Sequence, residues 1–438
     1  GDFFRVARPN GQNSDFYEIQ ARALLDGRLA VPEGSLGPEA FVVGGEHFMY
    51  FPPFPALLRM PHMLVTDAFD GHFTTVSLFA AWVLTAVALA LLLWRVRQLL
   101  VPNQPVGRFE VWFHGGFVLV ALGGSVWLHL AALPWVYHES YAWGIAGALW
   151  ALFALVGYVA RPSTWDAVAF CAWTTVAALS RSTAGWACAG AALLAALWIA
   201  AGRRGKAERR TWWPLVVAGL LPVAIGAAVN WAKFRHPFMF PIEDQIWSQI
   251  SPLRQRALAA NDGSLTGIQF LATTFVSYLR PDGIRFTSLF PFITLPAEPA
   301  DAVGGVQLDE SYRTGSVSAF MPGMVGLTVW GAIVAVRCKA VAARGLCFAL
   351  LGAAAIPAGV LLFGYVAHRY TAEFFVLLAV GGSVGGVDVA RRIDALSVGR
   401  RRILLGVGAA VLVFGVVANS ASAFQVQSVT ARGKALER

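Results

Sequence analysis

The sequence predicts an all-α membrane protein whose chain crosses the bilayer ten times, and three observations support this. Of the 438 residues, 57% are hydrophobic and only 13% are charged, which would give a water-soluble domain an unusually large apolar surface. Basic residues gather in short clusters between apolar segments. Five windows, each long enough for a membrane helix of about 20 residues, lack Asp, Glu, Lys and Arg: 73–94, 141–160, 211–232, 314–336 and 403–431.

The apolar segments and the polar residues between them define the predicted spans. Boundaries are set where charged, Pro- or Gly-rich residues interrupt the apolar pattern. The spans cover 73–94, 111–133, 142–160, 165–180, 184–202, 211–232, 317–336, 345–366, 371–388 and 403–422.

Alternate short loops between these spans are basic, and the positive-inside rule places them in the cytoplasm. The intervening loops 134–141, 181–183 and 367–370 hold only Arg181 and Arg369. A re-entrant pair at 165–180 and 184–202 would leave the side of every other loop unchanged. The basic loops carry Arg95, Arg97, Arg108, Arg161, Arg203, Arg204, Lys206, Arg209, Arg210, Arg337, Lys339, Arg344, Arg391, Arg392, Arg400, Arg401 and Arg402.

The chain therefore divides into membrane and extracytoplasmic parts. The first extracytoplasmic loop is 1–72, followed by membrane helices in 73–232. A second extracytoplasmic loop, 233–316, precedes the membrane helices in 317–422 and a tail at 423–438. Because the start is predicted to be external, we expect a further membrane helix before Gly1. The expected location is the plasma membrane.

Composition argues against other classes. A net charge of +9 would suit nucleic-acid binding, but the basic clusters are explained by membrane topology. Most of the 25 acidic residues fall on the external side, so carboxylate chemistry is expected there. The four cysteines lie within or beside apolar segments and have no metal-site spacing: Cys171, Cys188, Cys338 and Cys347.

The first external loop contains two interfacial elements. Residues 14–29 place Phe16, Ile19 and Leu24 on one face of a short helix lying on the membrane surface. A Gly- and Pro-rich crossing leads to an aromatic, Pro-interrupted element at 47–61. Simple anchoring of the bundle is the alternative function for both elements.

These two elements resemble motifs of the C superfamily of polytopic glycosyltransferases (GT-C). Asp15-Phe16-Tyr17-Glu18-Ile19-Gln20-Ala21-Arg22-Ala23-Leu24-Leu25-Asp26-Gly27 is similar to its acidic surface helix, and Gly45-Glu46-His47-Phe48-Met49-Tyr50-Phe51-Pro52-Pro53 to its Tyr-Pro-Pro element. The protein O-mannosyltransferases and the lipid A aminoarabinose transferase are the most similar members. Phe51 stands where the latter has a phosphate-binding Lys, and the chain has no Asp-x-Asp.

The resemblance implies transfer of a sugar from a polyprenyl-phosphate donor to an external acceptor, which could be a glycan, a lipid or a protein. An inverting reaction needs a carboxylate to accept the acceptor's hydroxyl proton. Asp15 is at the acidic position of the family and is the first candidate, with Glu18 second. The alternative for Asp15 is an N-cap of its helix.

The leaving phosphate needs cationic partners. Arg369 is preferred, because 368–374 is similar to an Arg-Tyr segment of bacterial relatives. Its alternative is an interfacial arginine paired with Glu373 at i+4, and Lys233 has an anchoring alternative. The further candidates are His368, Arg59, Lys233 and Arg285.

Aromatic and polar residues near these cations are expected to line the substrate site: Tyr50, His138, Glu139 and Tyr370. His138 beside Glu139 lacks a third ligand at a known spacing, so no metal and no cofactor is predicted. The loop 233–316 is expected to carry a surface helix over 242–260, a turn at 261–263 and an amphipathic run to Tyr278, and to cover the active site.

A multispan transporter or lipid-linked sugar flippase is the main alternative function. Such a protein should carry ionisable residues within its spans and related halves, and the sequence shows neither. A membrane acyltransferase is less favoured, since no suitable His-Asp pair is found. High Ala, Val, Trp and Arg usage suggests a GC-rich bacterium, such as an actinobacterium, and a substrate in its cell envelope.

Overall fold

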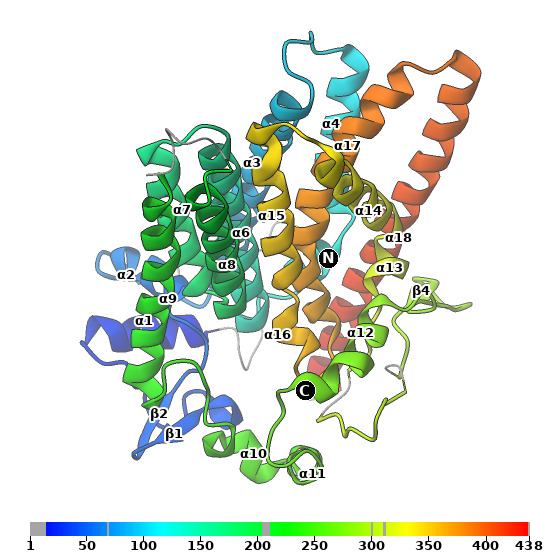
Figure 1. The fold of residues 1–438 in the computed structure, drawn as a ribbon. Helices are drawn as coiled ribbons and strands as arrows, with labels where there is room; N and C mark the ends of the chain where they lie inside the picture. Colours follow the sequence, from blue (N-terminus) through cyan, green and yellow to red (C-terminus); the bar gives the residue numbers. More distant parts are fainter. Residues whose placement is uncertain (1–14, 68–69, 204–210, 299–300, 310–311, 437–438) are drawn as a thin grey trace.

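A computed structural model describes residues 15–67, 70–203, 211–298, 301–309 and 312–436. It is a bundle of long helices, with short elements gathered beneath one end (Figure 1). We call this the loop-rich end; it is formed by the described parts of 15–72 and 235–316. The opposite end, which holds Arg95, Arg337 and Arg391, is called the basic end. Gly1, Arg204, Lys206, Arg209 and Arg210 lie outside the described residues.

The loop-rich end begins with the predicted surface helix. Helix α1 (Phe16–Leu25) buries Phe16 and Tyr17 and packs against α2. Gly44 and Gly45, both with positive φ, form the turn of a small antiparallel hairpin, which the prediction did not contain. The elements of the first loop are α1, η1 (Gly37–Glu39), β1 (Phe41–Val43), β2 (Glu46–Phe48) and α2 (Phe54–Met63).

The second loop agrees with its prediction in outline. The expected surface helix over 242–260 is present as three short pieces, and the amphipathic run ends at Leu279. A second two-stranded hairpin follows. The elements are η3 (Ile242–Asp244), α10 (Ile246–Ile250), α11 (Pro252–Ala260), η4 (Ile268–Phe270), α12 (Leu271–Leu279), β3 (Arg285–Phe286) and β4 (Ile293–Thr294).

The bundle is formed by the remaining helices, of which the long ones extend between the two ends (Figure 1). Helix α6 lies at its centre and packs against α3, α7, α8 and α15. The helices are α3 (Phe73–Leu100), α4 (Arg108–Gly123), α5 (Val126–Ala131), α6 (Val136–Ala160), α7 (Thr164–Ala178), α8 (Ser182–Ala200), α9 (Trp213–Phe234), α13 (Val317–Phe320), α14 (Pro322–Arg337), η5 (Val341–Ala343), α15 (Arg344–Ala355), α16 (Ala358–Leu361), η6 (His368–Phe374), α17 (Phe375–Asp394) and α18 (Val398–Leu436).

Within the described residues, 7 helical segments are long and apolar enough to cross a membrane. The predicted spans 111–133, 165–180 and 317–336 are also helical, but each contains only a shorter or broken helix. A helical, multi-pass membrane fold is thus supported, whereas the number of ten crossings stays a prediction.

Two of these breaks share one buried side chain. Helix α4 ends before Gly124, and α13 ends at Phe320, so each break frees a backbone carbonyl. The Asn419 amide of α18 donates to the carbonyl of Gly124 at 3.1 Å and to that of Phe320 at 2.9 Å. A Cβ on Gly124 would lie 2.5 Å from Val416, so the close approach of α18 requires glycine there. The helix breaks are therefore stabilised by packing that sequence periodicity does not show.

Candidate functional site

Asp15 lies at the start of α1, as the sequence predicts. Its backbone carbonyl accepts the amides of Glu18 and Ile19 at 2.8 and 3.0 Å, but its side chain caps no amide of this described helix. The carboxylate is exposed. The N-cap alternative is therefore not observed, and Asp15 is free to face solvent at the loop-rich end.

Glu18, one turn later, is buried in contrast. Its Oε2 accepts the Gly71 amide at 2.8 Å, and its Oε1 has no hydrogen-bond partner among the described residues. Burial raises the pKa of the Glu18 carboxyl, and the Gly71 amide and the Arg59 charge oppose this rise in part. A carboxylate with a raised pKa is a better proton acceptor near neutral pH.

Arg59 and Glu139 form a buried ion pair. The two Nη atoms of Arg59 donate to the Glu139 carboxylate oxygens at 2.7 and 2.8 Å, and the side chains are 2% and 0% exposed. The same Nη atoms also donate to the Pro55 carbonyl and to Thr74 Oγ1. Each Nη atom makes two hydrogen bonds, so Arg59 links α2, α3 and α6, and only its Nε has no hydrogen-bond partner among the described residues.

Arg369 has a different environment. Its guanidinium carbon lies 4.5, 5.6 and 5.2 Å from the ring centroids of Tyr137, Tyr365 and Tyr370. Its Nε is buried and has no hydrogen-bond partner, and no acidic residue in the described part of the chain forms an ion pair with it. A half-buried guanidinium surrounded by neutral rings has donors available for an anion.

The alternative pairing of Arg369 with Glu373 is wrong. Glu373 instead forms an ion pair with Arg181, which precedes α8, and Arg181 lies over the Tyr141 ring at 4.5 Å. Tyr141 is also 6.1 Å from Tyr370. A second arginine is thus placed beside the tyrosines of Arg369, and the Glu373 carboxylate pairs with this second arginine.

Arg181 is a residue that sequence reasoning missed as a site candidate. The available signal was its position, since it is the only basic residue of the acid-free loop 181–183. Its partner Glu373 is 192 positions away, and no local pattern indicates such a pair.

Tyr50 lies near Arg369, in the region where the sequence predicts the substrate site. Burial, together with the nearby charge of Glu39, raises the pKa of Tyr50, and the charge of Arg369 opposes this. The Tyr50 ring is 4.0 Å from that of Phe51, and Phe51 is 5.4 Å from Tyr137. Tyr50, Tyr137, Tyr365 and Tyr370 therefore form an aromatic wall around Arg369, which we call the tyrosine wall.

A hydrogen-bond chain joins this wall to the second loop. The Tyr137 hydroxyl donates to Glu39, whose other oxygen accepts Gln245 Nε2 at 3.3 Å. Arg254 donates to Gln245 at 2.6 Å and to Asp309 at 2.7 Å. Glu39 and Arg254 were not among the predicted residues, because the Gly- and Pro-rich sequence around Glu39 shows no site pattern.

The predicted histidines hold backbone segments in place. His138 Nδ1 lies 3.0 and 2.9 Å from the carbonyls of Leu130 and Leu133, and His368 Nδ1 accepts the Gly315 amide at 3.2 Å. Both are buried and contact His129, with ring centroids 5.6 and 4.7 Å away. His368 thus points into a histidine cluster, whereas its neighbour Arg369 contacts the tyrosine wall.

Lys233 and Arg285 also have backbone partners. Lys233 Nζ is buried and donates to the carbonyls of Met49 and Phe51 at 2.9 and 3.0 Å, which fixes the segment before Pro52. Arg285 is exposed on β3 and donates to the carbonyls of Asp282 and Ile284. The structure therefore does not bring either residue into contact with Arg369.

No group of three or more His, Cys, Asp or Glu side chains able to hold a metal ion occurs among the residues that the structure describes. In this region Glu373 pairs with Arg181, Glu39 accepts from Tyr137 and Gln245, and His138 and His368 bond the backbone.

Comparisons with known proteins identify the fold. No known family model matches the chain, and no curated protein matches it. The oligosaccharyltransferase of Archaeoglobus fulgidus in its apo form is similar in structure, with a TM-score of 0.51 and 15% identity over 95% of this chain. A structure of the archaeal oligosaccharyltransferase AglB from the same organism, with an inhibitory peptide and a dolichol-phosphate, gives 0.50 and 11% over 96%.

The chain spans about half the length of these proteins, covering 53% of each. Their likeness and the long apolar helices agree with the resemblance carried by the first-loop motifs. The chain therefore has a helical membrane fold similar to that of the archaeal oligosaccharyltransferase.

Proposed function

We propose that the chain is an inverting glycosyltransferase that moves a hexosyl or pentosyl group from a polyprenyl-phosphate donor to an extracytoplasmic acceptor. The carrying observation is Arg369, a half-buried guanidinium without an acidic partner among the described residues, set in the tyrosine wall beside Arg181. The dolichol-phosphate bound to the similar archaeal protein supports a lipid-phosphate ligand for this fold.

The proposed reaction is a single displacement at the anomeric carbon. The acceptor hydroxyl oxygen forms the new bond to that carbon, and its proton passes to Asp15 or Glu18. The bond from carbon to the phosphate oxygen breaks, and the phosphate leaves with the electron pair. Arg369 stabilises the charge that grows on the phosphate. Displacement from the opposite face inverts the configuration.

The acceptor is expected at the loop-rich end, where α1 and the second loop meet the tyrosine wall. Asp15 is exposed to a solvent-side acceptor, and the buried Glu18 is the reserve base. A peptide binds the similar archaeal protein; a glycan, lipid or protein acceptor of the cell envelope remains our expectation for this chain. Tyr50 and Tyr370 are expected to line the bound donor.

The test is sugar transfer by the purified protein in lipid nanodiscs, with a panel of radiolabelled polyprenyl-phosphate sugars. We expect transfer or slow donor hydrolysis with one donor, unaffected by EDTA, and at least a 100-fold loss in Asp15→Asn, the range expected for a general base. The exposed variant Asp262→Asn is the matched control and should retain full activity.

Three results would contradict the proposal. Full activity of the double variant Asp15→Asn with Glu18→Gln would show that neither carboxylate is the base. Loss of activity with EDTA and its return with Mg²⁺ or Mn²⁺ would show a metal-dependent reaction. Movement of an intact lipid-linked sugar across proteoliposomes, without bond cleavage, would identify a flippase.

A further inference from the structure

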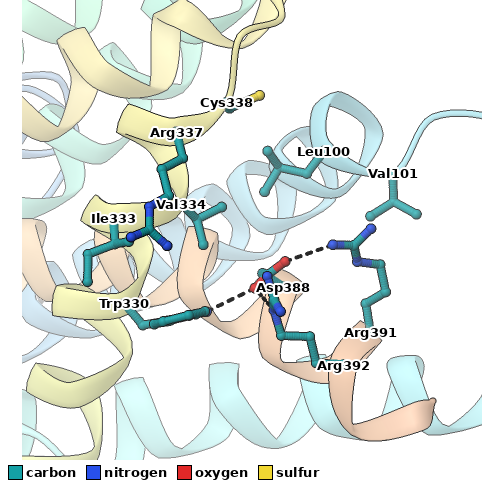
Figure 2. Close-up of a pocket in the computed structure, with 10 residues that line it drawn as sticks. All are labelled: Leu100, Val101, Trp330, Ile333, Val334, Arg337, Cys338, Asp388, Arg391 and Arg392. Carbon is teal, nitrogen blue, oxygen red and sulfur yellow. Dashed lines mark hydrogen bonds and ion pairs between the residues drawn. The ribbon is translucent and has the colours of Figure 1, made fainter.

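A pocket at the basic end lies far from Arg369. Its lining comes from the ends of α3, α14 and α17: Leu100, Val101, Trp330, Ile333, Val334, Arg337, Cys338, Asp388, Arg391 and Arg392 (Figure 2). The cavity measures about 220 Å³. Arg369 begins the same helical segment that carries Asp388, and at about 1.5 Å per residue the two are roughly 30 Å apart, the thickness of a bilayer core.

The two helices that supply most of the pocket lining, α14 and α17, pack closely against each other. A Cβ on Gly331 would lie 2.0 Å from the Gly381 carbonyl oxygen, so the backbones of α14 and α17 touch at glycines, as membrane helices often do. Gly331 directly follows Trp330, which lines the pocket. The position of the pocket wall is therefore determined by the bundle itself.

Asp388 organises the arginines of α17. Its carboxylate is only 7% exposed and accepts Arg391 Nη2 at 3.0 Å and Arg392 Nε at 2.5 Å. It also accepts Trp330 Nε1 at 2.9 Å, and Arg392 lies over the Trp330 ring at 5.3 Å. One carboxylate thus fixes two guanidinium groups that remain 52% and 59% exposed.

Arg337 adds a third cation from α14. In Figure 2 it stands on the opposite side of Asp388 from Arg391. It is exposed and has no ion pair or hydrogen bond to another residue in the described ranges. Three guanidinium groups against one carboxylate leave a net positive charge at the mouth of the pocket.

The remaining lining is apolar. Leu100 and Val101 at the end of α3, with Ile333 and Val334 of α14, supply the apolar wall of the pocket. A soluble phosphate would leave this wall without a partner, whereas a phospholipid offers a phosphate at the level of the arginines and hydrocarbon beside the apolar residues. A headgroup with net negative charge suits the uncompensated cations.

From these contacts we propose that this pocket binds the phosphate headgroup of an anionic phospholipid at the membrane face opposite the loop-rich end. Arg337 and Arg391 donate to the phosphate oxygens from two sides. Asp388, Arg392 and Trp330 position Arg391. The proposal concerns lipid binding alone and does not depend on the proposed transferase activity.

Native mass spectrometry of the detergent-purified protein tests it, with phosphatidylglycerol and phosphatidylcholine titrated separately. Wild type should bind phosphatidylglycerol at least ten-fold more tightly than phosphatidylcholine. Arg337→Gln with Arg391→Gln should lose that preference, since each charged hydrogen bond contributes about a ten-fold factor. Arg337→Lys keeps the charge without the bidentate fork, and should lose only part of it.

Arg400→Gln is the matched control at the basic end outside the pocket, and should behave as wild type. An unchanged preference in the double variant would overturn the proposal, as would an equal loss in Arg400→Gln, which would show general electrostatic attraction. If the double variant fails to fold, Arg337→Gln alone decides. Stabilisation of wild type by inorganic phosphate, lost in the variant and without lipid preference, would assign the pocket to a soluble phosphate.

Discussion

Arg369 differs in its partners from three other buried or half-buried arginines near the loop-rich end. Arg59, Arg181 and Arg254 each pair with a carboxylate, whereas Arg369 is surrounded by tyrosine rings. A half-buried cation without a counter-charge has lost part of its hydration free energy. A bound anion would offset this loss. This difference in partners is the reason that Arg369 is assigned to the phosphate and Arg59 is not.

Arg369→Gln should lower kcat/KM for sugar transfer by about 100-fold to 1,000-fold, because it removes a donor to charge that develops on the leaving group. The kcat/KM of Arg369→Lys should fall between those of wild type and Arg369→Gln, since Lys keeps the charge but lacks the planar fork. The measurement is steady-state transfer in nanodiscs, with the melting temperature as a folding check. Arg285→Gln removes an exposed arginine of the same end and should be silent; an equal loss there would contradict the assignment.

Glu18 gives a pH-dependent prediction. Burial raises the pKa of its carboxyl, so the folded state holds this proton more tightly than the unfolded state does. Stability from this group is present at low pH and is lost as the pH rises through the folded-state pKa. Glu18→Gln should therefore melt at a higher temperature than wild type at pH 7 to 8, and the difference should shrink below about pH 4.5.

Thermal melting of both proteins across that pH range measures this effect. Asp15→Asn is the matched control, because it removes an exposed carboxylate from the start of the same helix. A difference between Glu18→Gln and wild type that grows towards low pH would show that Glu18 is stabilised as the anion instead.

Sequence reasoning at the residue scale was best where a motif marks the position. Asp15, Tyr50 and Arg369 were selected from local patterns and lie at the loop-rich end, although their roles stay predictions. The ion pairs Arg59–Glu139 and Arg181–Glu373 join residues 80 and 192 positions apart. Local periodicity carries no information on such pairs, so the roles of Arg59 and Glu139 could not be read from sequence.

At the scale of elements, the buried pair Arg59–Glu139 joins three helices. Glu139→Gln should lower the free energy of unfolding by about 3–5 kcal/mol, because it leaves a buried guanidinium without its counter-charge. The double variant Arg59→Met with Glu139→Met should lose less. Melting in nanodiscs measures both changes, with the exposed pair partner Arg22→Gln, expected to cost under about 1 kcal/mol, as the control.

A double variant that is less stable than Glu139→Gln alone would contradict this ordering. It would show that packing of the Arg59 side chain against Tyr17 and Phe73, which lie 5.4 and 5.9 Å from its guanidinium carbon, matters more than the charge balance.

Helix positions were predicted well and helix interruptions were not. Each predicted span contains helix because a long apolar segment in lipid must satisfy its own backbone hydrogen bonds. The breaks at Gly124 and after Phe320 depend on Asn419 of α18, a residue that lies about 100 or more positions away. Tertiary hydrogen bonds of this kind override local periodicity, which is why boundaries in 111–133 and 317–336 differ from the prediction.

At the scale of the whole molecule, the charge pattern predicts which end faces the cytoplasm. In intact cells, a membrane-impermeant maleimide should label Asp262→Cys at the loop-rich end and should not label Arg400→Cys at the basic end. Arg400→Cys should become labelled only after the membrane is permeabilised. Both variants require a background without the four native cysteines, and that background itself is the control for unspecific labelling.

Labelling of Arg400→Cys but not Asp262→Cys in intact cells would invert the predicted topology. The proposed sugar transfer would then take place on the cytoplasmic side. The fold would be unaffected, because it depends on helix packing and not on which side the loops face.

The hydrogen-bond chain from Arg254 through Gln245 and Glu39 to Tyr137 has a consequence for the order of substrate addition. The chain begins in the second loop and ends on the Tyr137 ring, which contacts Arg369. A ligand that shifts one end would therefore change the free energy of ligand binding at the other end. By thermodynamic linkage, the effect is reciprocal: a donor phosphate on Arg369 would favour one arrangement of the second loop, and an acceptor held by that loop would tighten the donor. The two substrates are then expected to bind cooperatively and to form a ternary complex before sugar transfer.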